Sequence, residues 1–235
     1  MTEQLFARLD IYYDVAPHSA AMNMAIDEAL LETTVVPTIR FYRWHSPALS
    51  FGYFGKFSQV SIYAAKRDLV RRWTGGGIVF HGEDLTYSIL IPASDSVFNE
   101  SSIASYEKIH RSLAVALNGV GERAVVAGDV DSGGIALSKH ATVSASDYNC
   151  FANPVRADLM IDDRKIAGAA QRRTRRGLLQ QGSIQGITTN TDLAQKFAQA
   201  LSADCSEFEI GEEVFQRARE LAQQKYGTES WLRKR

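Results

Sequence analysis

The sequence has little of several features that would place it in a specialised class. It has only two cysteines, Cys150 and Cys205, which are too few for a disulfide framework. It has no apolar run near the roughly 18 residues of a membrane span, and its first residues lack the pattern of a signal peptide. A net charge of −1 gives no overall basic field. We therefore expect a cytoplasmic protein with reduced cysteines and with no membrane or nucleic-acid partner.

The apolar content is ample, because 45% of the 235 residues are hydrophobic. A chain of this size can bury one core without disulfides, so we expect a single domain over 1–235 and, by default, a monomer. Alternating and helical spacings predict a set of strands and helices. The expected strands are 5–13, 38–44, 48–54, 78–80, 84–92, 157–161, 165–173 and 178–184, and the expected helices are 20–32, 58–68, 101–117, 191–201 and 211–226.

The order of these elements indicates the fold class. We expect 78–80 to pair with 84–92 through a turn at 82–83, and 157–184 to form a meander. Residues 128–147 are rich in Gly, Ser and Asp, which predicts a long loop. Hairpins separated by helices are typical of an α+β fold, with a mixed β-sheet covered by helices.

One glycine-rich stretch stands out as a candidate binding element. It reads Arg71-Arg72-Trp73-Thr74-Gly75-Gly76-Gly77-Ile78-Val79-Phe80-His81. Glycines without a Cβ let a ligand approach the backbone N–H groups, and two arginines suit a carboxylate or phosphate. The stretch lacks the spacing of a Walker A loop or a dinucleotide fingerprint. It therefore predicts either an anion cradle between two strands or a tight hairpin with solvated arginines.

Lys165 lies in a strand of small and apolar residues, with Gly168 leaving space beside it. A lysine loses hydration in such a place and is tolerated where an oxygen ligand receives it. It could bind a substrate carbonyl or carboxylate, or it could simply reach solvent from the end of the strand.

Two other residue types could carry chemistry. Cys150 lies in a polar loop and could act as an acyl nucleophile or be an inert small side chain, whereas the acids around Cys205 disfavour a thiolate there. His81 could donate to a bound carbonyl or to Tyr87, or be purely structural. The histidines lack partners at metal-ligand spacing, so we expect no metal site. Four arginines crowd one hairpin turn and could be solvated or meet an acidic carrier protein, namely Arg172, Arg173, Arg175 and Arg176.

Together these motifs resemble the catalytic domain of the lipoate and biotin protein ligases, on the lipoate side. The glycine stretch is followed by Asp84-Leu85-Thr86-Tyr87. The resemblance continues through Asn23-Met24-Ala25-Ile26-Asp27-Glu28-Ala29-Leu30, Arg40-Phe41-Tyr42-Arg43-Trp44, Lys165-Ile166-Ala167-Gly168-Ala169-Ala170-Gln171-Arg172, Gly182-Ser183-Ile184, and Lys225-Tyr226 with Trp231. It spans nearly the whole chain, in the order of the family, while the Gly-Arg-Gly-Arg pattern of biotin ligases is absent.

The resemblance implies an enzyme that attaches an acyl group to a lysine of a lipoyl domain or of a glycine cleavage H-type protein. In such enzymes the lysine at the place of Lys165 holds the acyl carbonyl. Cys150 matches the cysteine nucleophile of octanoyltransferases that resemble lipoate ligases, which need no cofactor and take the acyl group from acyl carrier protein. The implied substrate-binding residues are Arg71, Arg72, Thr74, Gly75, Gly76, Gly77, His81, Tyr87, Gly168, Gln171 and Gly182.

Two alternatives stay open at this point. One is a lipoate-protein ligase that uses free octanoate or lipoate with ATP and Mg, although the extra C-terminal domain usual in such ligases is not expected here. The other is a module that binds an acyl group or a lipoyl domain without turnover. The chain departs from the family at Gln180-Gln181, where a histidine is usual, and at Gly55, where a glutamine is common.

Overall fold

The computed structural model describes residues 4–128, 155–187 and 191–234. Its main sheet has eight strands in the order β11-β1-β2-β6-β10-β9-β8-β7, and β1 runs parallel to its two neighbours while the other pairs are antiparallel. The expected mixed sheet is therefore confirmed. The strands are β1 Leu9–His18, β2 Thr38–Trp44, β6 Leu85–Pro92, β7 Val125–Val126, β8 Leu159–Ile161, β9 Arg164–Arg173, β10 Gly177–Ile184 and β11 Cys205–Glu207.

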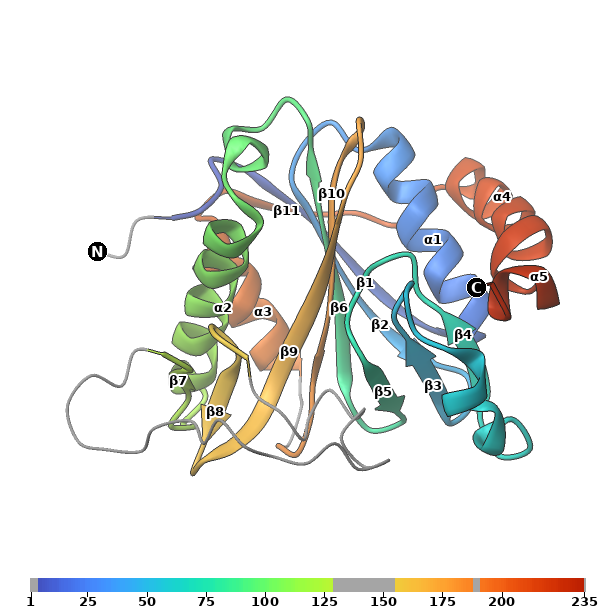
Figure 1. Cartoon of the computed structure of the whole chain (residues 1–235). Helices are drawn as coiled ribbons and strands as arrows, with labels where there is room; N and C mark the ends of the chain where they lie inside the picture. The colour runs from blue at the N-terminus through green and yellow to red at the C-terminus, as the bar shows by residue number, and fades with distance from the viewer. Residues whose placement is uncertain (1–3, 129–154, 188–190, 235) are drawn as a thin grey trace.

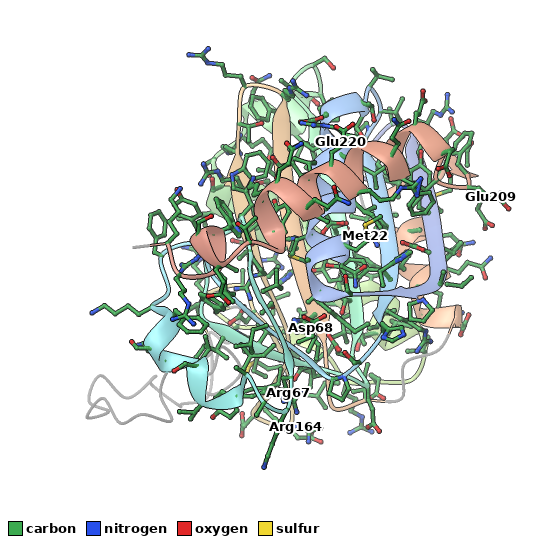
Figure 2. The ribbon with its side chains drawn as sticks, turned by 90° about the vertical axis from the view of Figure 1, so that its right-hand side faces the viewer. Met22, Arg67, Asp68, Arg164, Glu209 and Glu220 are labelled. Atoms are coloured by element: carbon green, nitrogen blue, oxygen red, sulfur yellow. The ribbon has the colours of Figure 1, made fainter. Side chains whose placement is uncertain are left out.

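Helices cover both faces of this sheet (Figure 1). On one face lie α2 (Ser102–Gly119) and α3 (Thr191–Leu201), whose apolar residues share a core with β6. On the other face, α1 (Ala20–Thr33) packs between the sheet and α4 (Glu212–Leu221), which continues as η5 (Ala222–Tyr226) and is followed by α5 (Glu229–Leu232). In Figure 2, α4 lies nearest the viewer and carries Glu220. Among the described residues, no helix is both long and apolar enough to cross a membrane.

Helix α1 is held by its neighbours as much as by its own sequence. Its residues are apolar on most sides, as suits a helix buried between two layers. The Ser19 side chain caps its first turn, and the Ala20 N–H donates to the carboxylate of Asp68, 2.7 Å away. Asp68 therefore fastens the start of α1 to the smaller sheet.

The smaller sheet has three strands, in the order β4 (Asp68–Arg71), β3 (Ala48–Phe51) and β5 (Ile78–His81). Strand β3 lies between the other two, parallel to β4 and antiparallel to β5. The glycine loop 72–77 therefore crosses over β3 rather than closing a hairpin between its own flanking strands. Two 3₁₀ turns, η1 (Phe57–Gln59) and η2 (Ser61–Tyr63), lie between β3 and β4, and η3 (Ser96–Asn99) precedes α2.

Three expectations about local structure are wrong. The helix expected at 58–68 consists of η1 and η2, and its last residue already pairs with β3. The strand at 78–80 pairs with β3 and not with 84–92, because the Asp84 carboxylate accepts the Gly82 N–H at 3.0 Å and turns the chain toward the main sheet. The first strand begins at Leu9, not at residue 5, and extends to His18. The meander of β8, β9 and β10 is confirmed.

Candidate functional site

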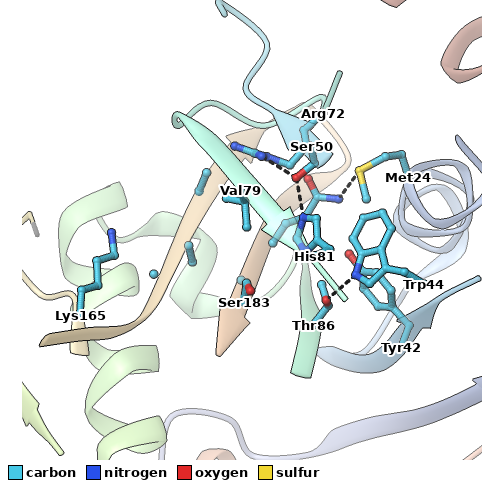
Figure 3. A pocket seen from close by; sticks show the side chains of 15 residues that line it. Met24, Tyr42, Trp44, Ser50, Arg72, Val79, His81, Thr86, Lys165 and Ser183 are labelled. Carbon is cyan, nitrogen blue, oxygen red and sulfur yellow. Dashed lines mark hydrogen bonds between the residues drawn. The ribbon is translucent and has the colours of Figure 1, made fainter. Parts of the chain in front are cut away.

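A cavity lies between the main sheet and the smaller sheet. It encloses about 480 Å³, part of which is open to solvent. Figure 3 shows Lys165 on one side of it and a group of aromatic and polar side chains on the other. The walls come from α1, β2, β3, β5, β6, β9 and β10, and they consist of Met24, Tyr42, Trp44, Ser50, Arg72, Val79, His81, Thr86, Lys165, Gly168, Ala169, Ala170, Gln181, Gly182 and Ser183.

Lys165 reaches this cavity as one half of a buried ion pair. Its Nζ lies 2.7 Å from Oδ2 of Asp158, and the two side chains are 5% and 0% exposed. Asp158 also accepts the Val155 N–H and the Tyr106 hydroxyl, each at 2.7 Å. Burial and the adjacent Asp158 raise the pKa of Tyr106, so its hydroxyl stays protonated and donates. The ammonium thus has a carboxylate partner at hydrogen-bond distance in a place that is closed to water.

Gly168 makes room for the ammonium. A Cβ at residue 168 would lie 2.6 Å from Cε and 2.8 Å from Nζ of Lys165, and 3.3 Å from Asp158. The next residue, Ala169, donates its N–H to the Tyr106 hydroxyl at 3.0 Å. The strand that carries Lys165 therefore also binds Tyr106 of α2, which in turn donates to Asp158.

Arg72 shapes the glycine loop from within. Its guanidinium donates to Ser50 Oγ at 2.7 Å and to the carbonyls of Gly75 and Gly77 at 2.9 Å each. Gly76 has a φ of 85°, a conformation that favours glycine. Of this loop, Arg72 lines the cavity, whereas Thr74, Gly75, Gly76 and Gly77 are not among the lining residues.

Neighbouring groups tie the same loop to the rest of the protein. The Thr74 hydroxyl donates to Gln181 Oε1 at 2.8 Å, and the Tyr53 N–H donates to the Thr74 carbonyl at 2.8 Å. Gly52 lies so close that a Cβ there would be 2.0 Å from the Gly76 carbonyl oxygen. Sequence reasoning missed Gly52, whose role depends on this contact between two loops.

Arg71 lies elsewhere, outside the residues that line the cavity. Its guanidinium donates to the carbonyls of Tyr53 and Gly55 at 2.7 Å, and to those of Trp231, Leu232 and Lys234 at 2.8–3.0 Å. Through these five acceptors, Arg71 links the segment after β3 to the C-terminal segment. The side chains of the neighbouring residues Arg71 and Arg72 therefore bind in different parts of the protein.

His81 is buried and makes hydrogen bonds to two side chains. Nδ1 lies 2.7 Å from Asp84 Oδ2, and Nε2 lies 2.7 Å from Ser50 Oγ. Its ring stacks on Trp44 with centroids 4.0 Å apart, and the Trp44 indole N–H donates to Thr86 Oγ1. His81 and Tyr87 do not meet, because Tyr87 contacts His110 on the opposite face of the sheet.

Tyr87, Gln171 and Gly182 divide between the two faces of the sheet. Tyr87 is packed in the core under α2 and α3, and Gln171 donates to Ser105 of α2 and to Gln180. Gly182 touches both sides: it lines the cavity, and a Cβ on it would lie 2.2 Å from the Tyr87 ring. Of the residues expected to bind substrate, the cavity thus brings together Arg72, His81, Gly168 and Gly182, beside Lys165.

The departures from the family pattern have structural partners. Gln181 donates to Asp27 Oδ2 at 2.7 Å and accepts from Thr74, so it joins α1 to the glycine loop. Gln180 faces α2 and accepts from Gln171. Gly55 gives its carbonyl to Arg71, and a Cβ there would be 3.1 Å from the Phe51 side chain, so a larger residue would fit tightly.

The two cysteines and the arginine cluster are also placed in part. Cys150 and most of 128–147 lie outside the described residues. Cys205 donates to backbone carbonyls, and burial together with Asp204 raises the pKa of its thiol. Arg173 donates to the carbonyls of Phe98 and Glu100. Arg176 lies 3.6 Å from the carboxylate of Glu32. Arg172 lies over the rings of Tyr53 and Trp73. Within the described ranges, no three His, Cys, Asp or Glu side chains gather as a metal site.

Sequence reasoning missed Asp158, Tyr106 and Ser50. Asp158 follows Ala157 and precedes an apolar strand, and an acid in that setting is a signal for a buried partner. Tyr106 fell within an expected apolar helix stripe, which hid its hydroxyl. Ser50 had no signal of its own, because its contacts to residues 72 and 81 depend on the pairing of β3 with β5.

Comparison with known proteins gives consistent matches. The model of the lipoyl protein ligase A/B catalytic domain matches residues 19–223. Octanoyltransferase LipM of Oceanobacillus iheyensis is 37% identical over 182 residues, which cover 74% of this chain and 62% of that protein. Octanoyltransferase LipM of Geobacillus kaustophilus is 37% identical over 172 residues, which cover 70% of this chain and 60% of that protein. The chain thus spans about three fifths of the length of these relatives.

Solved structures agree on the fold. Protein Ta0514 of T. acidophilum with bound lipoic acid superposes with a TM-score of 0.71 at 22% identity, covering 95% of this chain and 98% of that one. Lipoate-protein ligase A bound with ATP gives a TM-score of 0.72 at 21% identity, covering 96% and 98%. With the α+β architecture, the cavity and the match over 19–223 taken together, the chain belongs to the lipoyl protein ligase A/B catalytic domain family.

Proposed function

We propose that this protein is an acyltransferase that moves an octanoyl or lipoyl group, through a thioester on Cys150, to a lysine of a lipoyl domain or of a glycine cleavage H-type protein. Support comes from relatives named octanoyltransferase LipM and from a cavity whose walls suit a slender acyl chain. A structural neighbour from Thermoplasma acidophilum was solved as a lipoate protein ligase with its E2 lipoyl domain, which is consistent with such an acceptor.

The observation that carries this proposal is the ammonium of Lys165 at the wall of the cavity. A buried carboxylate holds it at 2.7 Å, and Gly168 leaves it space. A fixed cation beside a carbonyl stabilises the oxyanion that forms when a nucleophile attacks, and it acts most strongly where water is excluded. In this proposal Lys165 binds the acyl carbonyl and Asp158 positions the lysine.

The rest of the cavity suits the acyl chain. Met24, Val79, Ala169 and Ala170 supply apolar surface, and the Trp44 ring lies across from Lys165 (Figure 3). Arg72 is the residue of the glycine loop that lines this cavity, and its bonds to the carbonyls of Gly75 and Gly77 fix its position beside the chain. An acyl group bound in this way would point its carbonyl toward Lys165.

The proposed reaction has two half-reactions. The Cys150 thiolate attacks the acyl thioester of acyl carrier protein, the oxyanion forms beside Lys165 and backbone N–H groups of the glycine loop, and the carrier thiol leaves. The amine of the acceptor lysine then attacks the acyl-cysteine, loses its proton and releases the thiolate. Two easier steps replace one, and no ATP is consumed.

An intact-mass assay tests this proposal against its alternatives. The chain is offered octanoyl-acyl carrier protein in one reaction, and octanoate with ATP and Mg²⁺ in another, each with a lipoyl domain. We expect octanoylated lipoyl domain only in the first, together with a hydroxylamine-sensitive adduct on the enzyme that Cys150→Ser removes. Product only in the second reaction would establish a ligase. No product in either, with a lipoyl domain still bound, would establish a binding module.

A further inference from the structure

A second reactive arrangement lies across the cavity from Lys165. Ser50 comes from β3, His81 from β5, and Asp84 from the turn that leads to β6. Ser50 Oγ lies 2.7 Å from His81 Nε2, and His81 Nδ1 lies 2.7 Å from Asp84 Oδ2. These contacts have the order and the lengths of a serine, histidine and carboxylate triad. Figure 3 shows Ser50 and His81 together, well apart from Lys165.

The protonation states that such a triad needs follow from its surroundings. Burial raises the pKa of Asp84, but His81 and hydrogen bonds from Gly82 and Ser183 outweigh burial and bring the pKa to about 2. Asp84 is therefore an ionised acceptor, which places the imidazole proton on Nδ1. Burial lowers the pKa of His81 even though Asp84 opposes that shift, so the ring is neutral at pH 7. Nε2 is then the acceptor for the Ser50 hydroxyl.

Arg72 adds a positive charge next to the serine oxygen. One of its N–H groups donates to Ser50 Oγ at 2.7 Å, and the other contacts hold the guanidinium on the glycine loop. A fixed cation at this distance stabilises negative charge that develops on or beside the oxygen. Ser50, His81 and Arg72 all line the cavity, so this cluster borders the same space as Lys165.

We propose that Ser50, His81 and Asp84 form a second acyl-transfer centre, which hydrolyses activated esters and thioesters of short carboxylic acids. Ser50 Oγ bonds to the acyl carbon while its proton passes to His81 Nε2. The bond to the leaving group then breaks, and His81 returns the proton to the departing alcohol or thiol. Water next attacks the acyl-serine, gives a proton to His81, and releases the acid as the serine recovers its proton. Asp84 positions the histidine throughout.

The test uses the full chain with Cys150→Ala, so that cysteine chemistry does not contribute. It is incubated with p-nitrophenyl butyrate to follow turnover and, separately, with a fluorophosphonate to trap a reactive serine, which peptide mass mapping then locates. We expect hydrolysis above the buffer rate and a phosphonyl adduct on Ser50. Because this labelling needs no change at the cluster, it remains decisive even if variants there fold poorly.

Variants then assign the roles. Adding Ser50→Ala should remove the adduct and lower turnover by roughly 10²–10⁴-fold, and Asp84→Asn should lower turnover and shift its pH profile. Ser105→Ala is the matched control, because Ser105 is equally buried but lies in α2 outside the cavity lining. An adduct on another serine, no adduct, or equal loss in the Ser105 control would overturn the proposal.

Discussion

Replacing Gly168 with alanine should separate the position of Lys165 from the stability of the protein. The new Cβ would lie 2.6 Å from Cε and 2.8 Å from Nζ of Lys165. Carbon atoms pack best about 3.5–4.0 Å apart, so the ammonium must move by about 1 Å. The atoms that must move are the end of a flexible side chain. The free energy of unfolding should therefore change by less than about 1 kcal/mol.

Catalysis should be far more sensitive than stability. A displacement of about 1 Å in a positioned group can cost about 10²-fold in rate, or about 2.7 kcal/mol in the barrier. The rate of octanoyl transfer to a lipoyl domain, followed by intact mass, should fall by that factor, while urea unfolding stays close to the parent. Gly119→Ala is the control, because its Cβ would meet the Lys196 side chain at ordinary distances, 3.4 Å from Cδ and 3.7 Å from Cε. Transfer at the parent rate in Gly168→Ala would refute the role assigned to the ammonium.

Three further changes have defined outcomes. Asp158→Asn should lower the free energy of unfolding by about 3 kcal/mol in a urea titration. The double variant with Lys165→Met should recover part of that loss. Additive losses from the two substitutions would argue against a coupled pair. Gly182→Ala should cost about 1–3 kcal/mol, since its Cβ would lie 2.2 Å from the buried Tyr87 ring; an unchanged melting curve would contradict this. Burial lowers the pKa of His110 from 6.5 to about 4, so the unfolded chain takes up a proton at this residue at a higher pH than the folded chain does. The free energy of unfolding should therefore fall by about 3 kcal/mol between pH 6.5 and pH 4. His110→Gln should flatten this pH dependence, and an unchanged dependence in that variant would assign it to other groups.

The elements that were predictable from the sequence are those whose pattern is local. Strand Thr38–Trp44 and helix Thr191–Leu201 have the bounds that alternation and helical spacing indicate. In the helix, Leu193, Phe197 and Leu201 recur every four residues, and in the strand Ile39 and Phe41 lie on one face and Tyr42 and Trp44 on the other. The helix predicted at 58–68 was wrong because these residues also suit turns, and because the last of them belongs to β4 and pairs with β3.

The site was predictable only in part, for a related reason. Lys165 and the glycine stretch stand out by composition, and the structure puts Lys165 and Arg72 on one cavity. The partners that fix their positions are distant in sequence or lie across a sheet. Arg71 resembles Arg72 in the sequence, yet its acceptors include carbonyls 160 or more residues away. No local pattern encodes that choice.

The glycine loop is held by hydrogen bonds at four of its six residues, which limits how far it can move. The Arg72 side chain donates to two carbonyls of the loop, and the Arg72 backbone N–H donates to the carbonyl of Phe51. The Thr74 hydroxyl donates to Gln181, and the Thr74 carbonyl accepts from the Tyr53 N–H. The three bonds that join the loop to the rest of the protein, at about 1 kcal/mol each, would leave roughly one molecule in 160 with the loop detached. For the acyl transfer proposed above, acids branched near the carboxyl end should therefore be transferred more slowly than longer unbranched acids.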